Sequence, residues 1–419
     1  MLDKRPREAE WLSWLIAGSW AACILVTIPL ARVVSTLVAD TIGHHAFIWL
    51  TVLCIVGAVL WGLGALSRRR PPPAAYACLT IFGGNLLWLT WTLRGNPVEA
   101  FHLVQYGILS MLVYRALLHR YTDGGVFVLS VLLTTMVGIL DEWVQWLIPE
   151  RYWGLRDVGI NFTAALLAQG ALATGLRPAI VSGWPAGRTL SRICYSLAGV
   201  LAMLCLSYAN TPDRIAWYAE RLPGATFLLD GQSMMVEYGH LFDDPEIGLF
   251  RSRFDAEQLR SLDRKRGGEA ARIMSGYSED GEWHRFRKSY TVPRDPYVHE
   301  LGTHLFRRNR HLTLARDKTR PQRKRRDSYF IAQSENRILE KYFPRAIGES
   351  SHAWGPEVRL EVNSGAEATY RYESWVSHDL ITGFSRRQVM AGFLALIGAS
   401  LLLGALSAGR SSDPRQRER

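Results

Sequence analysis

The sequence contains eight long apolar blocks separated by polar connections, and this pattern constrains the fold more than any other feature. A helix that crosses the apolar core of a bilayer needs about 20 mostly apolar residues, and each block reaches or approaches this length. The pattern therefore predicts a mainly α, polytopic helical membrane bundle of about eight spans. The blocks cover residues 11–31, 46–66, 74–93, 100–118, 126–143, 158–176, 191–208 and 389–408.

The basic residues of the connections alternate along the chain. Lys and Arg total 49 against 38 Asp and Glu, which gives a formal net charge of +11. Most of the surplus lies at the two termini and around residues 68–70, 115–120 and 177–192. Because cytoplasmic loops are enriched in Lys and Arg, we expect both termini on the cytoplasmic side. Topology explains much of the charge, so a nucleic-acid partner is not predicted.

One polar stretch is long enough to form a soluble domain. Residues 209–385 lie between the seventh and eighth apolar blocks, and we expect them on the outer side of the membrane. The predicted organisation is a transmembrane region at 1–208, an extracytoplasmic domain at 209–385, a final span at 386–408 and a basic cytoplasmic tail at 409–419.

We expect this inserted extracytoplasmic domain to be α+β. Asp255 and Gln258 form a capping-box pattern, which predicts a helix from there to about Arg266. A second, short helix is expected at 335–342, because Pro344 would stop it. Partial alternation and many β-branched and aromatic residues favour strands elsewhere. The expected strand regions are 282–292, 298–315 and 357–375.

No metal site and no cofactor are predicted. All five cysteines fall within the apolar blocks, where a thiol behaves as a small hydrophobe. The segment HELGTH places His299 and His304 five residues apart, whereas the zinc-protease motif has its histidines at i and i+4, on one helical face. The sequence also has no phosphate-binding loop, no Gly-x-Ser-x-Gly elbow and no dinucleotide fingerprint.

Polar residues gather at one end of three successive apolar blocks, the end expected at the outer face. Glu99, His102 and Tyr106 stand at i, i+3 and i+7, within about 60° of one helix face. Residues 138–161 add further polar groups to the next two blocks. An ionisable residue within a span costs about 2.5–3.5 kcal/mol, so it usually faces a bundle interior or a water-filled cavity. The predicted polar cluster comprises Glu99, His102, Tyr106, Asp141, Glu142, Gln145, Arg151, Arg156, Asp157 and Asn161.

Three interpretations fit this polar cluster. In the first, carboxylates pair with arginines and lock three helices together. In the second, the cluster binds a polar headgroup that enters from the outer leaflet. In the third, Glu142, Asp141 or His102 acts as a general base, while Arg151 or Arg156 holds a phosphate through its planar set of donors. The residue types alone are compatible with all three.

The densest basic run of the sequence is RDKTRPQRKRR at residues 316–326. Such a run is usually a solvated, mobile loop. A basic segment beside an anionic membrane surface also gains about 1 kcal/mol per residue. The alternative to a loop is therefore a patch that binds anionic lipid headgroups or envelope polymers. Its residues would be Arg323, Lys324, Arg325 and Arg326.

The polar cluster resembles the pattern of VanZ-like membrane proteins. The matching segments are VEAFHLVQYGIL, LDEWVQ, PER with Pro149 and Arg151, and RDVGIN, and the resemblance covers roughly residues 88–175. Their order, spacing and placement on successive spans agree together. The family takes its name from a protein associated with teicoplanin resistance, and its biochemical activity is not established. The resemblance therefore implies a protein of the bacterial inner membrane and cell envelope, and it implies no defined reaction.

This chain departs from the family pattern in three places. It adds N-terminal spans, it carries the large domain at 209–385, and it has Gln169 in the sixth block, where small residues would pack more easily. A role in antibiotic resistance therefore does not follow from the resemblance.

Two functional hypotheses follow. The first is a non-enzymatic envelope component that binds membrane lipids, a lipid-linked precursor or an anionic polymer at the outer interface, with a link to the envelope or glycopeptide response. The second is an enzyme that modifies a lipid-linked envelope precursor by carboxylate or histidine acid–base chemistry. Transport is less favoured, because the charged residues gather at one interface, with no matching set at the midplane.

Overall fold

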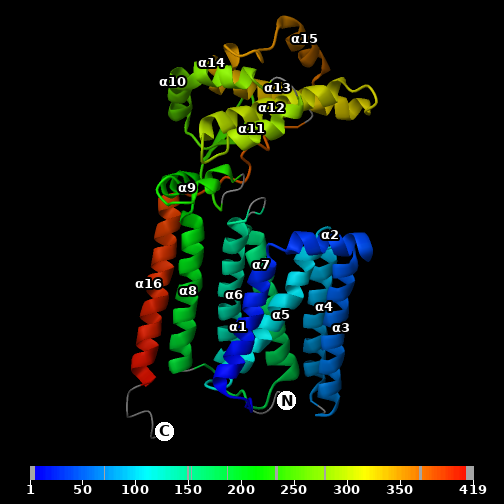
Figure 1. Ribbon diagram of the computed structural model, residues 1–419, viewed down its shortest axis with the longest axis vertical. Helices are drawn as coiled ribbons and strands as arrows, with labels where there is room; N and C mark the ends of the chain where they lie inside the picture. Colours follow the sequence, from blue (N-terminus) through cyan, green and yellow to red (C-terminus); the bar gives the residue numbers. More distant parts are fainter. Residues whose placement is uncertain are drawn as a thin grey trace. The chain divides into compact units, whose positions relative to one another are not determined.

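The computed structural model describes residues 5–69, 71–148, 151, 153–185, 187–231, 235–277, 280–367 and 370–411. Over these residues the chain is mainly α-helical, as predicted, and it divides into two compact units (Figure 1). Unit 1 contains residues 1–207 and 390–419, and unit 2 contains residues 208–389. Pro149 of the PER segment and residues 412–419 of the basic tail lie outside the described residues.

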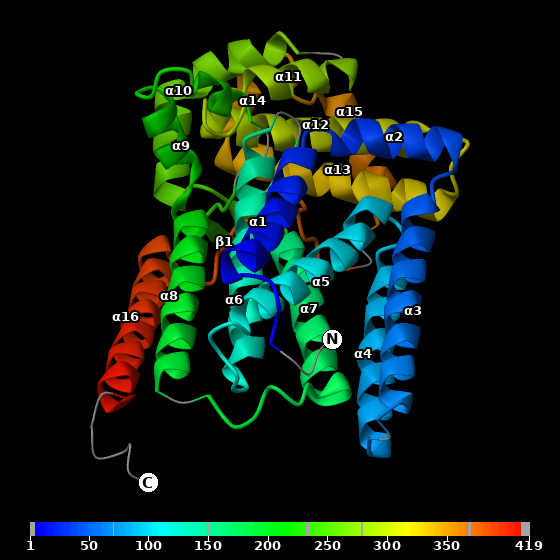
Figure 2. The same cartoon turned by 60° about the horizontal axis from the view of Figure 1, so that its bottom comes forward.

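Unit 1 is a bundle of long helices. The first residues of α1 and the last residues of α16 lie at the same end of this bundle, and α8 runs beside α16 in both views (Figures 1 and 2). The helices of the bundle are α1 (Glu10–Thr27), α2 (Ala31–Thr41), α3 (Ala46–Ser67), α4 (Pro73–Thr92), α5 (Pro97–Leu117), α6 (Gly125–Trp146), α7 (Leu155–Gly170), its π-helical continuation η1 (Ala171–Leu176), α8 (Arg188–Ala209) and α16 (Arg386–Ser411).

Seven helices in the described part of the chain are long and apolar enough to cross a membrane. They are α1, α3, α4, α6, α7 together with η1, α8 and α16. Large apolar side chains on their outer surfaces remain exposed, among them Leu53 and Leu394, as expected for helices that face lipid. This composition supports a helical membrane protein.

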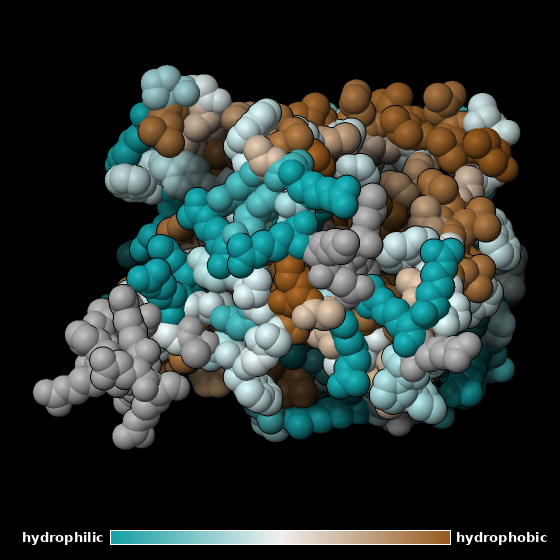
Figure 3. Space-filling model, turned by 90° about the horizontal axis from the view of Figure 1, so that it is seen from below, coloured by the Kyte–Doolittle hydropathy of each residue, from teal (hydrophilic) through white to brown (hydrophobic). Residues whose placement is uncertain are grey.

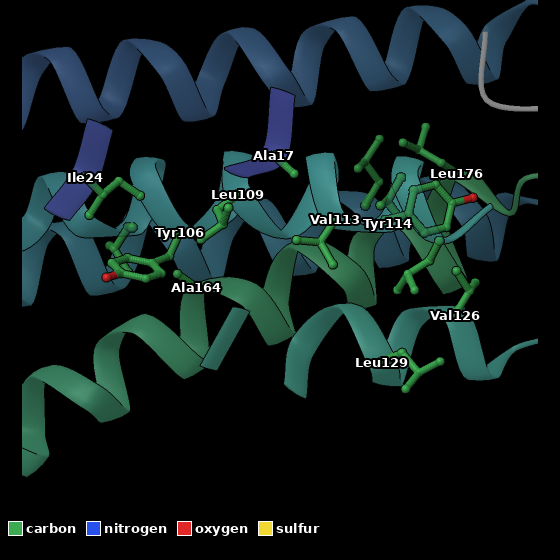
Figure 4. Packing of buried hydrophobic residues seen from close by; sticks show 14 of the residues in the cluster. Ala17, Ile24, Tyr106, Leu109, Val113, Tyr114, Val126, Leu129, Ala164 and Leu176 are labelled. Atoms are coloured by element: carbon green, nitrogen blue, oxygen red, sulfur yellow. The ribbon is translucent and has the colours of Figure 1, made fainter. Parts of the chain in front are cut away.

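The apolar block predicted at 100–118 forms α5, which is as long as its neighbours but more polar. Glu99, His102 and Arg115 lie on it, and it does not meet the apolarity of the other seven helices. Ten of its 21 residues are buried. The core of unit 1 forms around this helix, with Tyr106 and Leu109 packed among residues of α1, α6 and α7 (Figure 4). Burial by its neighbours explains how α5 tolerates polar side chains.

The first predicted block is wrong at its end, because α1 stops at Thr27 and not at residue 31. Pro29 has no backbone N–H and cannot continue the helical hydrogen bonding. The chain instead makes a turn in which the N–H of Leu30 donates to the carbonyl of Thr27 at 3.1 Å. A separate short helix, α2, follows this turn and occupies much of the connection between the first two blocks.

Unit 2 is also mainly helical, with one small antiparallel sheet in which His240 pairs with Ser252. Gly248 begins the second strand with φ +117°, and a side chain there would overlap the carbonyl of Tyr372. The elements of unit 2 are α9 (Pro212–Ala219), the 3₁₀ turn η2 (Thr226–Asp230), β1 (His240–Asp244), β2 (Gly248–Ser252), α10 (Ala256–Ser275), the 3₁₀ turn η3 (Asp280–Glu282), α11 (Trp283–Ser289), α12 (Pro296–Arg316), α13 (Gln322–Tyr342), α14 (Pro344–Gly348) and α15 (Pro356–Gly365).

The capping box is confirmed. The carboxylate of Asp255 accepts from the backbone N–H of Gln258 at 2.8 Å, and the Gln258 side chain accepts from the N–H of Asp255 at 2.9 Å. The helix that begins here, α10, runs to Ser275 rather than to about Arg266. Its second half continues because Ala270, Ala271 and Met274 are buried in unit 2.

The three predicted strand regions of unit 2 are wrong, because they form helices. Residues 283–289 are α11, residues 296–316 are α12, and residues 356–365 are α15. In α12, Asp295 caps the first turn by accepting from the N–H of Val298 at 3.1 Å, and Pro296 occupies the first position. Apolar residues then recur at helical spacing, including Leu301 and Leu305, and these signals outweigh local β propensity.

The core of unit 2 lies between α12 and α13, which pack along one another. Leu301 and Leu305 from α12 meet Ile338 and Leu339 from α13, and all four are almost completely buried. Phe343, at the end of α13, is completely buried in the same cluster. The predicted short helix at 335–342 is therefore the last third of a longer helix that begins at Gln322.

Candidate functional site

The first turn of α5 connects this helix to α7 through an ion pair. Pro97 occupies the first position of α5, and Asn96 Nδ2 donates to Glu99 Oε1 at 2.5 Å. The other oxygen, Glu99 Oε2, lies 3.3 Å from Arg156 Nη2 on α7. Arg156 is largely exposed, so this pair orients Glu99 and adds at most a modest stabilisation.

One helical turn further along α5, two aromatic rings meet the carboxylate of Asp141 on α6. The rings of His102 and Tyr106 stack, with their centroids 5.9 Å apart. Tyr106 donates its hydroxyl hydrogen to Asp141 Oδ2 at 2.8 Å, and His102 Nδ1 lies 3.8 Å from the same oxygen. Tyr106 and Asp141 are both completely buried. Their contact therefore fixes the register of α5 against α6 in an environment without bulk water.

Several buried polar atoms near this contact have no hydrogen-bond partner among the described residues. They are His102 Nδ1, Asp141 Oδ1, and both the oxygen and the nitrogen of the Asn161 side chain. A buried polar group left without a partner costs about 1–3 kcal/mol. Such atoms are rare in folded proteins and usually mark a place where water, an ion or a ligand binds.

Glu142, next to Asp141 on α6, has a different environment. Its Oε2 accepts from the backbone N–H of Gly154 at 3.0 Å, and its Oε1 accepts from Gln145 Nε2 at 3.0 Å. Asp157 lies close to the same backbone, because a Cβ built on Gly154 would be 2.9 Å from Asp157 Oδ2. Glu142 thus holds the start of α7 against α6, and both of its oxygens already accept hydrogen bonds.

A cavity of about 340 Å³ opens beside Asp141 in unit 1. One end of it is polar, formed by His102, Gln105, Asp141, Gln145 and Arg151. The rest of the wall is mostly apolar and comes from four helices and the turn between α1 and α2. These remaining residues are Trp20, Cys23, Ile24, Thr27, Ile28, Leu30, Ala31, Val34, Phe47, Val98 and Phe101.

The structure brings four members of the predicted polar cluster to this cavity. They are His102, Asp141, Gln145 and Arg151. Tyr106 does not line the cavity but holds Asp141 through its hydroxyl. The other members lie outside the lining and connect the helices or pack between them: Glu99, Glu142, Arg156, Asp157 and Asn161.

Sequence reasoning did not identify Gln105 or the apolar wall. Gln105 lies on α5 three residues after His102, so the same helical spacing could have identified it. Its backbone carbonyl accepts from Trp20 Nε1 at 3.0 Å, which joins α1 to α5 beside the cavity. No local pattern marks α1 and α2 as wall elements, because their position depends on the turn at residues 28–30.

The two histidines of HELGTH lie on α12 in unit 2 and have separate partners. His299 Nδ1 is 2.8 Å from the carbonyl oxygen of Tyr290, whereas His304 Nδ1 is 2.6 Å from Glu335 Oε2. No group of three or more His, Cys, Asp or Glu residues in the described ranges is placed to hold a metal ion.

The predicted basic patch forms the first turn of α13, so its reading as a loop is wrong. Pro321 precedes the helix and favours a helix start at this point. Arg325 Nε donates to the carbonyl of Ala315 at 2.8 Å, and Arg326 Nη1 donates to Glu367 Oε2 at 2.5 Å. Arg323 and Lys324 are exposed. Two of the four cations are therefore engaged within unit 2.

The cavity of unit 1 combines an apolar wall with a polar end that carries charges of both signs. Chemically, the wall can take up a hydrocarbon chain, and the polar end can form hydrogen bonds to a headgroup. Asp141 Oδ1 and His102 Nδ1 can also take up a proton. No family model, no curated protein and no solved structure matches the chain.

Proposed function

We propose that the chain is a VanZ-like integral membrane protein of the bacterial cell envelope that binds a lipid-linked or anionic envelope ligand. The observation that supports this most is the cavity beside Asp141, whose apolar wall ends at unpartnered buried polar atoms. An amphiphilic ligand matches both parts. Its hydrocarbon chain would lie along α1 and α2, and its headgroup would contact His102, Gln145 and Arg151.

The family assignment depends on the order of the motifs within residues 88–175. These motifs fall on α5, on α6 and at the start of α7, three helices that pack together in unit 1. Their polar residues meet at one end of the three helices. A shared site explains why such motifs would occur in one order and spacing, so it supports the VanZ-like assignment.

The proposed topology has eight spans, with α5 crossing the membrane inside a ring of more apolar helices. Both termini face the cytoplasm, residues 209–385 lie outside, and the cavity lies at the outer interface of the inner membrane. The alternation of basic connections supports this orientation. Figure 3 shows the end of unit 1 at which α1 begins, where hydrophilic side chains gather over much of the visible face.

The binding proposal is tested by native mass spectrometry of the full chain purified from bacterial membranes in mild detergent. Wild-type protein is expected to retain lipid. Ala31→Trp, which fills the apolar wall, and Arg151→Gln, which removes the cation from the polar end, are expected to lose it. Arg94→Gln is the matched control, because Arg94 is exposed and lies outside the cavity lining.

Two results would count against binding. One is wild-type protein that carries no lipid, and the other is retention of the same lipid by wild type and both cavity variants. Release of lipid by the Arg94 variant as well would show that retention does not depend on the cavity.

A specific observation also favours the second candidate, an enzyme that modifies a lipid-linked envelope precursor. Asp141 and His102 both line the cavity, and each has a buried atom without a hydrogen-bond partner among the described residues. A general base needs such an available atom within reach of its substrate. Glu142 is the less accessible candidate, because both of its oxygens accept hydrogen bonds.

The enzyme hypothesis is tested by incubating the full chain with isolated lipid-linked envelope precursors. Asp141→Asn and His102→Gln should abolish turnover and still retain lipid, whereas Glu142→Gln should reduce turnover less. Identical products from wild type and from both Asp141 and His102 variants would exclude this chemistry at the cavity.

A further inference from the structure

Unit 2 contains its own cavity, with a volume of about 690 Å³. It shares no residue with the cavity of unit 1. Most of its lining comes from one face of α12, and the rest comes from α11 and the segment that follows Ser374. The lining residues are Trp283, Thr303, Phe306, Arg307, Arg310, His311, Thr313, Leu314, Trp375 and Val376.

Arg307 is held in this cavity by a buried carboxylate. Its Nε lies 3.0 Å from Oε1 of Glu335, a residue of α13 that is completely buried. Glu335 also accepts from Ser374 Oγ at 2.7 Å and lies 2.6 Å from His304 Nδ1. A guanidinium fixed in this way loses little side-chain entropy when it binds a ligand.

Two further nitrogen-bearing side chains follow Arg307 on the same helix. Arg310 is exposed and forms no ion pair with the described residues. His311 lines the same cavity, and its Nδ1 is buried without a hydrogen-bond partner among those residues. The cavity thus presents donors that match a carboxylate or a phosphate, and only Arg307 is paired with a carboxylate of the protein.

Flat aromatic faces lie next to these cations. Trp283 packs on Phe306, with the ring centroids 4.8 Å apart. Trp375 remains 68% exposed, and its ring stacks on His378 with a centroid distance of 5.0 Å. An exposed tryptophan at the edge of a cavity buries its apolar face only when a ligand covers it.

We propose that this cavity binds an anionic saccharide, that is, a sugar ring carrying a phosphate or a carboxylate. Arg307, Arg310 and His311 bind the anionic group, and the C–H face of the ring packs against Trp375 or Trp283. The volume lies within the usual range for organic ligands of about 300–1,000 Å³, so it exceeds what a bare inorganic anion needs.

His311 provides a direct readout of an anion at this position. Its burial, together with the positive charges of Arg307 and Arg310, lowers its pKa to about 4, although Glu335 acts in the opposite direction. Arg320 also lowers this pKa. An anion bound beside the imidazole stabilises its protonated form. Ligand binding therefore raises the pKa of His311.

The experiment uses the full chain in detergent micelles and isothermal titration calorimetry. The probes are glucose 6-phosphate and glucuronate, which carry the two kinds of anion, and the controls are glucose and inorganic phosphate. At least one anionic sugar should bind in the millimolar range or tighter, and both controls should bind more weakly. The probe that binds better identifies the preferred anion.

Variants connect binding to this cavity. Arg310→Ala removes a charge-assisted hydrogen bond and should weaken binding roughly tenfold, and Trp375→Ala should weaken it through loss of the apolar face. Arg323→Ala is the matched control, because Arg323 is exposed on α13 and does not line the cavity. In the histidine NMR spectrum, the imidazole signal that disappears in His311→Gln should titrate at higher pH when the sugar is present.

Three outcomes would overturn the proposal. The first is that neither anionic sugar binds. The second is that inorganic phosphate binds as well as the sugar phosphate, which means an adventitious ion only. The third is that Arg310→Ala and Trp375→Ala bind like wild type. Because the cavity in unit 1 contains none of these residues, lipid retention is measured on the same variants and reports separately on the proposed function.

Discussion

Tyr106 on α5 donates its hydroxyl hydrogen to Asp141 Oδ2 on α6, and the other oxygen of the same carboxyl group has no hydrogen-bond partner among the described residues. The two oxygens of Asp141 therefore differ in role. One connects two helices of the bundle, and the other remains available at a residue that lines the cavity. Clamp and ligand site thus share one side chain.

Tyr106→Phe should destabilise unit 1. The change keeps the ring and removes the hydroxyl, so the buried Asp141 Oδ2 loses its donor at a cost of about 1–3 kcal/mol. Thermal unfolding of the full chain in detergent measures this loss. Tyr195→Phe is the control, because Tyr195 is 39% exposed on α8. Equal unfolding temperatures for wild type and Tyr106→Phe would contradict a structural role for the hydroxyl.

Gly302→Ala should destabilise unit 2 through a clash. Gly302 lies within α12, and a Cβ there would overlap the ring of Phe286, which is completely buried. Overpacking of this kind costs about 1–3 kcal/mol, and the higher helix propensity of Ala offsets less than about 1 kcal/mol of it. Gly348→Ala on α14 has open space around it and should be neutral. Thermal unfolding of both variants compares them, and equal stability would show that the Phe286 ring yields.

His299 should make unit 2 less stable as the pH falls below neutrality. Burial, followed by the positive charge of Arg253, lowers its pKa from 6.5 to about 4 in the folded state. Arg287 also lowers it, whereas the carbonyl of Tyr290 and Asp295 raise it. Between these two pKa values the unfolded chain binds more protons. The contribution is therefore complete above about pH 6.5 and is lost progressively towards pH 4.

The size of this effect is up to about 3 kcal/mol over that pH range. His299→Asn removes the titrating group and should flatten the dependence of the unfolding temperature on pH between about 4 and 6.5. His284→Asn replaces an exposed histidine on α11 and should keep the wild-type dependence. The interpretation fails if His299→Asn retains the full wild-type slope.

Glu335→Gln should be strongly destabilising. Burial raises the pKa of Glu335, but the charge and hydrogen bond of His304, together with hydrogen bonds from Tyr372 and Ser374, keep it below its usual value. The carboxylate is therefore charged and balances Arg307, and removing one partner of a buried pair costs about 3–5 kcal/mol.

The matched control for Glu335→Gln is Glu340→Gln on the same helix. Glu340 pairs with Arg359 at 2.6 Å near the surface, so its loss should cost less than about 1 kcal/mol. Urea unfolding of the full chain compares the two variants. A similar loss of stability in both would show that burial of the Glu335 network adds nothing.

The helices of unit 1 could be predicted from the sequence because their signal is local. A run of apolar residues long enough to cross a bilayer shows itself without any tertiary contact, and the prediction of a mainly α protein is confirmed. The break at Pro29 was missed, although proline is a local signal. In unit 2, the residues of α12 have both β-branched side chains and a helical spacing of Leu301 and Leu305. Only packing against α13 decides between them.

The candidate site could be predicted in part. Helical spacing placed His102 and Tyr106 on one face of α5, and the structure stacks their rings. That Tyr106 meets Asp141 depends on the relative rotation of α5 and α6, which no short pattern encodes. The apolar wall depends on α1 and α2, which lie more than 100 residues before Asp141 in the sequence.

The polar character of α5 has a consequence for how the protein is made. This helix emerges from the ribosome after α1, α3 and α4 but before α6 and α7, so at first it lacks two of the helices that bury it. Until they arrive, Glu99 and His102 have no complete protein environment, and lipid is a poor substitute. Membrane insertion of α5 is therefore cooperative with its neighbours, and truncating the chain after Leu117 should leave this segment uninserted.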